Sequence, residues 1–413
     1  MNVELLTIGT ELLLGFTVDT NAAHIARTLG EIGVRVVRRA TVYDRREDIR
    51  EALREGLART GAVITTGGLG PTRDDITKRV VADLFGAPLE FDDRIWEELV
   101  ERFARLGRIA PAVNRLQAEV PRGATVLPNR WGTAPGLWLE GEPGIAILLP
   151  GVPREMRMLL QHELVPRLAA RSGERVIRSR MVRTSGIPES LLAERLGDIE
   201  DQVAPLTLAY LPGYDGVDLR LTAWDAAAAD ADPALTAGVA LLHERAGEHV
   251  YGEGDADLAA VLLEAARERG VRIAVAESCT GGLVGKRLTD TPGSSDVFVG
   301  GVIAYDNAVK TALLDVPAAL LETHGAVSGE VVSAMALGAA RRFEVRLAIA
   351  VTGVAGPGGG SEAKPVGTVW LATALDGAPR VTKVLLPGSR EEIRLRAAQA
   401  ALLLPWRRLR AER

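Results

Sequence analysis

The sequence predicts two α/β sandwich domains with mainly parallel sheets, joined by a small α+β domain. The chain has 413 residues, which is too long for one ordinary domain. Strand-like apolar runs alternate with helical patterns over residues 1–170 and again over 255–413, which is typical of open sheets wrapped by helices. Residues 175–250 instead contain a strand, a helix, two strands and a helix, which indicates a small α+β domain.

The first block alternates strands and helices in a regular order. Strands are expected at 3–8, 34–42, 62–66, 137–140 and 145–149. Helices are expected at 19–29, 44–59, 74–85, 92–106 and 153–169. Asp19 or Thr20 caps the first helix, and Asp44 caps the second.

Strands and helices of the middle and last segments are predicted from the same patterns. In the middle segment we expect strands at 175–184, 206–211 and 217–224, a helix after Pro188, and a helix at 233–246. A Gly/Asp-rich joint, GEGDAD at 252–257, precedes the second α/β block. In that block, strands are expected at 272–276, 297–304, 346–352, 366–373 and 381–386, and a final helix at 389–408.

Composition excludes several classes of protein. Hydrophobic residues make up 47%, charged residues 25%, and the mean hydropathy is +0.10, so the chain is globular and not disordered. No apolar run approaches the roughly 18 residues that span a bilayer, and the start lacks a basic leader, so we expect a cytoplasmic protein without membrane contact. The net charge of −5 argues against direct nucleic-acid binding.

Cysteine and histidine usage restricts the metal chemistry. Cys279 is the single cysteine, so an intrachain disulfide and a cysteine-rich zinc site are both impossible. The five histidines have no ligand spacing. A metal would therefore have to be held by carboxylates and phosphate oxygens, as Mg²⁺ is.

A first candidate site is the segment TTGGLGPTRDD at 65–75. It follows a buried strand and precedes a helix, where backbone amides of Gly67, Gly68 and Gly70, together with Thr72, can approach a phosphate. Asp74 and Asp75 would repel that phosphate unless a divalent cation bridges them, so they are candidate metal ligands and catalytic residues. The alternative is a capped helix, because Thr72 with Asp75 fits a capping box.

Two further loops should reach the same sheet edge, the segments 9–21 and 148–156. They supply Asp19, Asn21 and Glu155 as candidate ribose, metal or base contacts. The alternatives stay open, because Asp19 can be a helix cap and Glu155 a first-turn carboxylate.

A second candidate site begins at AESCTGG, 276–282, where a strand ends in hydroxyl and thiol residues before a helix. Ser278 is a candidate nucleophile, and Thr280 and Gly281 are candidate substrate contacts at a helix start whose amides could hold an oxyanion. Helix capping is the alternative. Cys279 is a rival nucleophile.

The base for this serine is predicted to be a lysine. His324 is the only histidine after residue 255, and no aspartate partner lies near it in sequence, so a Ser-His-Asp triad is poorly supported. The chain has only five lysines, and one of them, Lys310, follows a strand together with Tyr305. A buried lysine with a lowered pKa can take a proton from serine; a solvated lysine on a helix face is the alternative.

A glycine-dense loop, 348–360, completes the second site. Thr352 stands at the end of a strand, and Gly353 and Gly356 follow it, in an arrangement that suits phosphate binding. Arg390 and Arg394 begin the last helix, where they could bind an anionic ligand.

These motifs resemble a known family. GTELLLG at 9–15, DTN at 19–21, TTGGLGPTRDD and LPGVPREM at 149–156 resemble the amino-terminal domain of the CinA (competence/damage-inducible) family, itself similar to molybdopterin-binding domains. The last part of the chain resembles the carboxy-terminal CinA domain, a nicotinamide-nucleotide amidase. The motifs that carry this resemblance are AESCTGG, AYDNAVK at 304–310, HGAVS at 324–328, the segment 351–370 and SREEIR.

The resemblance implies a bifunctional hydrolase with domains at 1–170, 175–250 and 255–413. The first domain would be a metal-dependent ADP-ribose pyrophosphatase that uses Mg²⁺ or a similar ion at Asp74 and Asp75. The last domain would deamidate nicotinamide mononucleotide without a cofactor. Its nucleophile would be Ser278 and its base Lys310.

By the same resemblance, Tyr305 and Thr352 would support that pair, and Arg394 would bind the substrate. The middle domain resembles the family's KH-type domain, but we expect it to lack a GxxG loop, since TSGIPES at 184–190 does not supply one. It is also not basic, so a structural or dimerising role is expected. A homodimer is expected. The alternative function is a scaffold protein linked to competence or DNA repair that binds a pterin or a nucleotide.

Overall fold

The computed structural model describes residues 1–172 and 175–411. These residues form two compact units. The first unit comprises Met1–Arg178 with Ala223–Pro233, and the second comprises Ser179–Thr222 with Ala234–Arg413.

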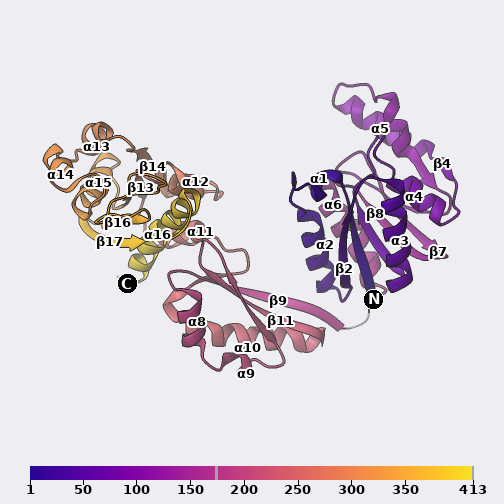
Figure 1. The fold of residues 1–413 in the computed structure, drawn as a ribbon, viewed down its shortest axis with the longest axis horizontal. Helices are drawn as coiled ribbons and strands as arrows, with labels where there is room; N and C mark the ends of the chain where they lie inside the picture. Colours follow the sequence, from indigo (N-terminus) through magenta and orange to yellow (C-terminus); the bar gives the residue numbers. More distant parts are fainter. Residues whose placement is uncertain (173–174, 412–413) are drawn as a thin grey trace. The chain divides into compact units, whose positions relative to one another are not determined.

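The first unit is built on a six-stranded sheet in the order β2-β1-β3-β8-β7-β6 (Figure 1). The strands are β1 (Asn2–Ile8), β2 (Arg35–Val42), β3 (Ala62–Thr66), β6 (Thr125–Leu127), β7 (Gly136–Gly141) and β8 (Gly144–Leu149). The pairs β1·β2, β1·β3 and β3·β8 are parallel, whereas β7 and β6 continue the sheet antiparallel. The carboxyl ends of β1, β3 and β8 therefore lie side by side.

Helices cover both faces of this sheet. The helices of the unit's main layers are α1 (Thr10–Leu13), α2 (Thr20–Glu31), α3 (Arg46–Thr60), α4 (Thr77–Leu84), α6 (Pro153–Leu159) and α7 (Val165–Ala169). Successive residues of β1 point to opposite faces: Leu5 joins the core under α2 and α6, and Leu6 the core under α3 and α4.

A small extension follows α4. It consists of helix α5 (Asp93–Arg105), the antiparallel pair β4 (Leu89–Phe91) and β5 (Glu119–Pro121), and a 3₁₀ turn at Ala112–Ala118. Ile95, Leu99 and Ala118 form its core, and the Arg115 guanidinium lies 4.3 Å from the centre of the Phe91 ring. The sequence predicted α5 but not the two short strands.

The middle domain has a four-stranded sheet in the order β10-β11-β9-β12. Its elements are β9 (Arg175–Thr184), α8 (Glu189–Leu196), α9 (Ile199–Gln202), β10 (Thr207–Pro212), β11 (Val217–Ala227), α10 (Ala228–Ala246) and β12 (Val250–Glu253). Helix α10 begins five residues earlier than expected, at Ala228 and not at 233, because the alanines before Pro233 are strong helix formers.

The second unit ends in a five-stranded sheet in the order β14-β13-β15-β16-β17. Its strands are β13 (Ile273–Glu277), β14 (Phe298–Ile303), β15 (Leu347–Gly353), β16 (Thr368–Leu375) and β17 (Ala378–Leu385). β13 is parallel to both β14 and β15, and β16 and β17 are antiparallel.

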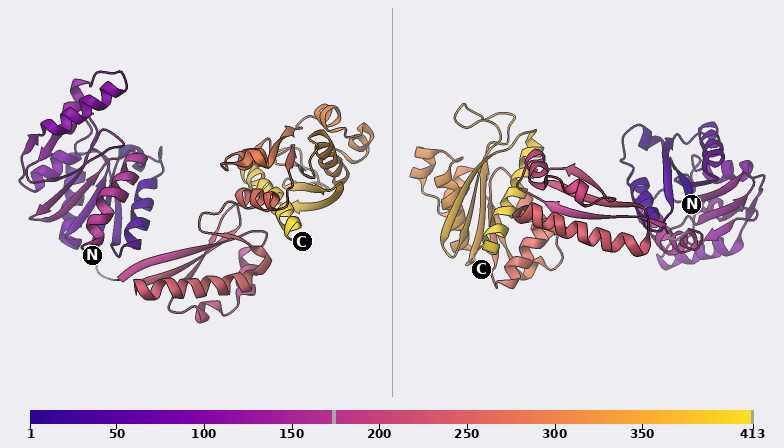
Figure 2. Two further views of the ribbon diagram at one scale, coloured as in Figure 1. Left: turned by 180° about the vertical axis from the view of Figure 1, so that it is seen from behind. Right: turned by 90° about the horizontal axis from the view of Figure 1, so that it is seen from below.

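Helices again cover both faces of this sheet, as Figure 2 shows from two sides. The helices are α11 (Leu258–Glu268), α12 (Leu283–Thr289), α13 (Asn307–Leu314), α14 (Ala318–His324), α15 (Gly329–Arg342) and α16 (Arg390–Ala411). Val275 and Val351 pack toward α11, α12 and α16, while Ala276 and Ala350 pack toward α15.

The predicted fold class is thus confirmed: two α/β domains with parallel-containing sheets flank a small α+β domain. Both sheets are mixed, because the later strands of each domain return as antiparallel hairpins. Among the described helices, none has the length and apolarity needed to cross a bilayer.

Candidate active sites

The glycine loop after β3 packs directly against neighbouring strand ends. Gly67 has φ +108°, and a Cβ there would lie 2.2 Å from the Ile8 carbonyl oxygen. Gly68 has φ +68°, and its Cβ would lie 2.0 Å from the Thr77 hydroxyl oxygen. Only glycine fits at these positions, so the loop is held close to the end of β1 and the start of α4.

The acidic pair of this loop converges on Thr72. The Thr72 amide donates to Asp75 Oδ2 at 2.8 Å, the Thr72 hydroxyl lies 2.5 Å from the same oxygen, and it also contacts Asp74 Oδ1. Hydrogen bonds from the Thr72 hydroxyl and from the Asp74 amide lower the pKa of Asp74. Gly70 stands against Asp75, where a Cβ would lie 2.5 Å from Oδ2.

Asp74 and Asp75 could bind a metal ion only together with ligands from outside the protein. Residues 1–172 and 175–411 contain no group of three or more His, Cys, Asp or Glu side chains that could hold an ion. Two adjacent carboxylates suit Mg²⁺ that is held mainly by substrate phosphates and water. The same contacts are those of a helix cap formed by Thr72 and Asp75. The geometry therefore fits a helix cap and a Mg²⁺ site equally well.

Asp19, Asn21 and Glu155 all have protein partners. Asp19 caps α2, accepting from the Ala22 amide at 2.9 Å. Asn21 bridges two strand ends, because its Nδ2 donates to Gly151 O at 2.7 Å and to Thr66 Oγ1 at 3.3 Å. Asn21 Oδ1 is buried and has no hydrogen-bond partner among the described residues, so it could accept a hydrogen bond from a ligand.

Glu155 is engaged with a neighbouring loop. Asn129 Nδ2 donates to Glu155 Oε2 at 2.6 Å, and Gly132 lies so close that a Cβ would be 1.7 Å from the Glu155 carboxyl carbon. Burial raises the pKa of Glu155. In the structure, Glu155 therefore contacts and holds the loop that contains Asn129 and Gly132.

Lys78 near this site was not singled out as a site residue. It is 9% exposed, and its Nζ donates to Leu116 O at 2.6 Å. Burial lowers the pKa of Lys78 to about 8, against the opposing effect of Glu119, and the Asp75 carboxylate also favours the charged amine. The sequence feature that could have drawn attention to Lys78 is that the chain has only five lysines.

The second site lies where three parallel strands end together. The Ser278 amide donates to Val351 O at 2.9 Å, and the Ala304 amide donates to Glu277 O at 2.7 Å. Ser278 thus follows β13, Tyr305 follows β14, and Thr352 lies at the end of β15. The predicted nucleophile and its two supporting residues therefore share one sheet edge.

Lys310 is buried beside this edge. It lies on α13 and is 1% exposed, and its Nζ donates to the Tyr305 carbonyl at 3.0 Å. Burial lowers the pKa of Lys310, opposed by the negative charge of Asp306. The alternative of a solvated helix-face lysine is wrong, because this amine is desolvated.

Cys279 has the properties of a core residue. It is 5% exposed and belongs to the apolar core between the sheet and α11, α12 and α16. Burial raises the pKa of the Cys279 thiol to about 12. Since the thiolate is the reactive form of cysteine, this raised pKa argues against Cys279 as a nucleophile at neutral pH.

Glu277 is a functional candidate that the sequence analysis missed. Its side chain is 1% exposed and accepts three backbone amides: Gly282 at 2.9 Å, Val284 at 3.1 Å and Gly285 at 2.8 Å. The amides of Gly282, Val284 and Gly285 are therefore not free for an oxyanion. A carboxylate immediately before the nucleophile was the signal that could have revealed this anchor.

Thr352 and Arg394 contact backbone groups, whereas the Tyr305 hydroxyl contacts a side chain. The Thr352 hydroxyl donates to Ala326 O at 2.8 Å. Tyr305 is 62% exposed, and its hydroxyl accepts from Arg390 at 3.1 Å. Arg394 donates to Cys279 O at 3.2 Å and to Thr280 O at 2.9 Å, so it holds the nucleophile loop from the α16 side.

The remaining predicted contacts lie around the same edge. The Gly281 amide donates to Ser278 O at 3.1 Å, and the Gly356 carbonyl accepts from Arg390 at 2.7 Å. Gly353 pairs with Val369 on β16. The Thr280 hydroxyl is buried without a hydrogen-bond partner among the described residues, so it is open to a ligand.

The middle domain does contain a G-x-x-G sequence, Gly213-Tyr214-Asp215-Gly216, which the sequence analysis overlooked. It forms the turn between β10 and β11, closed by a hydrogen bond from the Gly213 amide to Gly216 O at 2.8 Å. The Asp215 carbonyl accepts from Ser185 and from Gln399, both at 2.8 Å. This turn is engaged in packing within the second unit.

Family models match the chain in three consecutive parts. Residues 4–170 match a probable molybdopterin binding domain, 179–252 the damage-inducible protein CinA KH domain, and 255–408 the CinA C-terminal domain.

Whole-chain relatives agree with these matches. A CinA-like protein of Gemmatimonas aurantiaca is 54% identical over 406 residues, covering 97% of this chain and 95% of the relative. A putative competence-damage inducible protein of Symbiobacterium thermophilum is 42% identical over 421 residues, covering 99% of each chain. The crystal structure of competence/damage inducible protein CihA from Agrobacterium tumefaciens is 43% identical, with a TM-score of 0.34, covering 35% of this chain and 89% of that one. The two relatives that match along the whole chain show that it belongs to the CinA family.

Proposed function

We propose that the last domain hydrolyses the carboxamide of nicotinamide mononucleotide to nicotinic acid mononucleotide and ammonia. The single observation that supports this best is the desolvated Lys310 amine beside the strand ends that carry Ser278 and Thr352. A buried amine has a larger neutral fraction, and only the neutral amine can accept a proton from serine.

The proposed reaction proceeds in two stages. Neutral Lys310 takes the Ser278 hydroxyl proton while the oxygen attacks the carboxamide carbon. The C–N bond then breaks, the leaving nitrogen takes the proton from Lys310, and ammonia departs. Water attacks the resulting ester with Lys310 again as base, which releases the carboxylate and restores the serine hydroxyl.

Backbone anchors would keep the nucleophile loop, residues 278–282, in place during these steps. Glu277 fixes the start of α12, and Arg394 fixes the carbonyls of Cys279 and Thr280. The protonated Cys279 thiol would not compete with the serine.

The amidase proposal is tested by ammonia release from nicotinamide mononucleotide with EDTA present. Free nicotinamide is the control substrate, because it has the same amide without ribose phosphate. Release from the mononucleotide supports the proposal; no release would make this edge a binding pocket.

For the first domain we propose metal-dependent hydrolysis of ADP-ribose to AMP and ribose 5-phosphate. The Gly67 amide donates to Leu149 O at 3.1 Å, so the loop amides that follow it, from Gly68 to Gly70, would hold the diphosphate. Asp74 with Asp75 would hold Mg²⁺ against it. When bound, such an ion polarises a phosphoryl oxygen and lowers the pKa of an attacking water.

A binding role for this domain is the second candidate, supported by its match to a probable molybdopterin binding domain. The two roles are distinguished by AMP formation from ADP-ribose with and without Mg²⁺. Retained binding without cleavage would favour the scaffold.

A further inference from the structure

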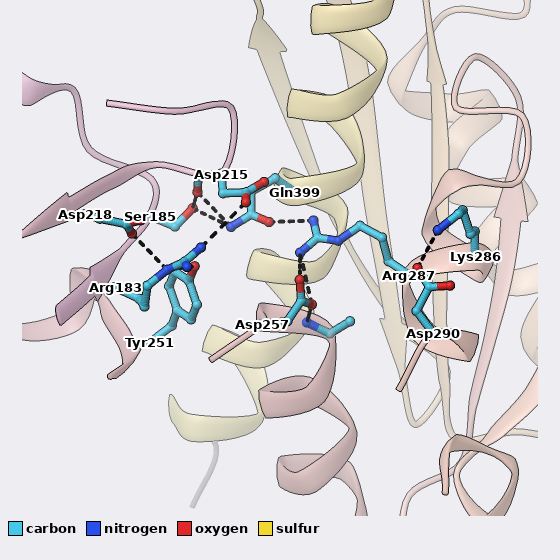
Figure 3. A network of polar contacts seen from close by, with 11 residues as sticks. Arg183, Ser185, Asp215, Asp218, Tyr251, Asp257, Lys286, Arg287, Asp290 and Gln399 are labelled. Atoms are coloured by element: carbon cyan, nitrogen blue, oxygen red, sulfur yellow. Dashed lines mark hydrogen bonds and ion pairs between the residues drawn. The ribbon is translucent and has the colours of Figure 1, made fainter. Parts of the chain in front are cut away.

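Within the second unit, the middle domain contacts the last domain through polar side chains (Figure 3). At the centre of this contact is Gln399 of α16, which is 3% exposed. Its Nε2 donates to Asp215 O at 2.8 Å and to Ser185 Oγ at 3.1 Å. Both acceptors belong to the middle domain, and Asp215 lies in the turn 213–216, called the GYDG turn below.

The other end of the same amide holds a second helix. Gln399 Oε1 accepts from Arg287 Nη1 at 2.6 Å, and Arg287 lies on α12. The Arg287 guanidinium also donates to both Asp257 oxygens, at 2.9 and 3.1 Å, and Asp257 caps α11 through the Ala259 amide. One buried amide therefore joins the GYDG turn, α16 and α12.

These two helices are the ones that hold the nucleophile loop. Arg394 lies five residues before Gln399 on α16, about 7.5 Å along the helix axis, and donates to Cys279 O and Thr280 O. Helix α12 begins directly after the loop and is anchored by Glu277 through the Gly282 amide. A shift of either helix at Gln399 would be transmitted to the loop through these contacts.

From these contacts we infer that Gln399 is a positioning residue for deamidation, which ties the GYDG turn to the two helices that hold Ser278. The inference rests on the proposed amidase function. It gives the middle domain a role in that reaction: the domain sets the relative placement of α12 and α16. Gln399 acts through Arg394 and Arg287.

The test compares two substitutions of Gln399 in the full chain. Gln399→Met keeps the length and helix propensity and removes both hydrogen-bonding ends. Gln399→Glu keeps an acceptor for Arg287 but loses the donor to Asp215, so it isolates the link to the middle domain. We expect kcat for nicotinamide mononucleotide to fall about tenfold or more in both, with KM changed less than about twofold, because misplacement affects the reacting geometry more than binding.

A matched control separates positioning from general destabilisation. Val239→Ala removes buried methyl groups from α10, on the helix layer of the middle domain, without touching Gln399. It should lower Tm while leaving kcat unchanged. Equal loss of kcat in Val239→Ala at a comparable loss of Tm would overturn the inference.

A second readout does not depend on amidase activity. Cys279 is the single cysteine, is buried, and has its carbonyl held by Arg394, so its rate of alkylation by iodoacetamide reports local opening of the loop. Both Gln399 variants should be alkylated several-fold faster than wild type, and Val239→Ala should not. If wild type releases no ammonia, the amidase proposal fails, and the alkylation rates still decide whether Gln399 holds the nucleophile loop in place. Wild-type alkylation rates in both Gln399 variants would refute it.

Discussion

Replacing Lys310 by methionine separates its proposed chemical role from its contribution to folding. Methionine retains most of the apolar stem, which fits a site where the side chain is 1% exposed. The substitution removes the amine and its hydrogen bond to the Tyr305 carbonyl at 3.0 Å.

The structure predicts effects of different size on stability and on rate. Losing a hydrogen bond from a charged donor costs about 1.5–3 kcal/mol, and relief of the buried charge offsets a similar amount. The free energy of unfolding should therefore change by about 1 kcal/mol or less, a Tm shift of about 2–4 °C. Loss of a general base lowers the rate about 10²–10⁴-fold, equivalent to about 3–5 kcal/mol in activation free energy.

The pH dependence supplies a further check. Burial places the folded-state pKa of Lys310 below the ordinary 10.5. The wild-type rate should rise with pH through that folded pKa, because the neutral amine is the base. The cost of burying the charged amine is present below the folded pKa and is relieved as pH rises toward 10.5, so this contribution makes wild-type stability rise over that interval.

The assay is ammonia release over a pH series, with thermal melts of the same samples. Lys383→Met is the matched control, because Lys383 is an exposed lysine on β17 of the same domain. We expect the control to keep the wild-type rate. A Lys310→Met enzyme that also keeps the wild-type rate would refute the assignment of Lys310 as the base.

Three further predictions concern single side chains. Asp75→Asn should abolish AMP formation from ADP-ribose and leave deamidation unchanged; persistent Mg²⁺-dependent cleavage would place the ion elsewhere. Lys78→Met should raise the free energy of unfolding at pH 7 by about 1 kcal/mol, because relief of the charge buried when the pKa falls from 10.5 to about 8 on folding exceeds the loss of the hydrogen bond to Leu116 O. That gain should vanish as pH rises from 8 to 10.5, and urea unfolding with a pH-independent gain would contradict it. Glu277→Gln should lower kcat for deamidation and speed alkylation of Cys279, since a neutral amide cannot accept three backbone amides as well as a carboxylate does; unchanged values of both would argue against Glu277 as the loop anchor.

Much of the fold could be predicted because the period of the apolar residues is a local property. The buried run AVITT became β3, and Asp19 became the cap of α2. The short strands β4 and β5 were missed, since three-residue strands carry too few residues for a period to show. The domain boundaries at 1–170, 175–250 and 255–413 stay a prediction.

The candidate site was predictable only to the level of shared strand ends. Parallel strands bring Ser278, Tyr305 and Thr352 to one edge, which follows from their places in the chain. The partner of each side chain did not follow, because it lies far away in sequence: Gln399 and Ser185 are 214 residues apart, and Arg394 and Thr280 are 114 apart. Burial of Lys310 likewise depends on packing of α13.

The central claim is that Ser278, and not Cys279, is the nucleophile of a metal-independent amidase. The most direct measurement is ammonia release from nicotinamide mononucleotide with EDTA present, by wild type, Ser278→Ala and Cys279→Ala. We expect activity in wild type and Cys279→Ala and its loss in Ser278→Ala. Loss in Cys279→Ala with activity retained in Ser278→Ala, or no release by wild type, would contradict the claim.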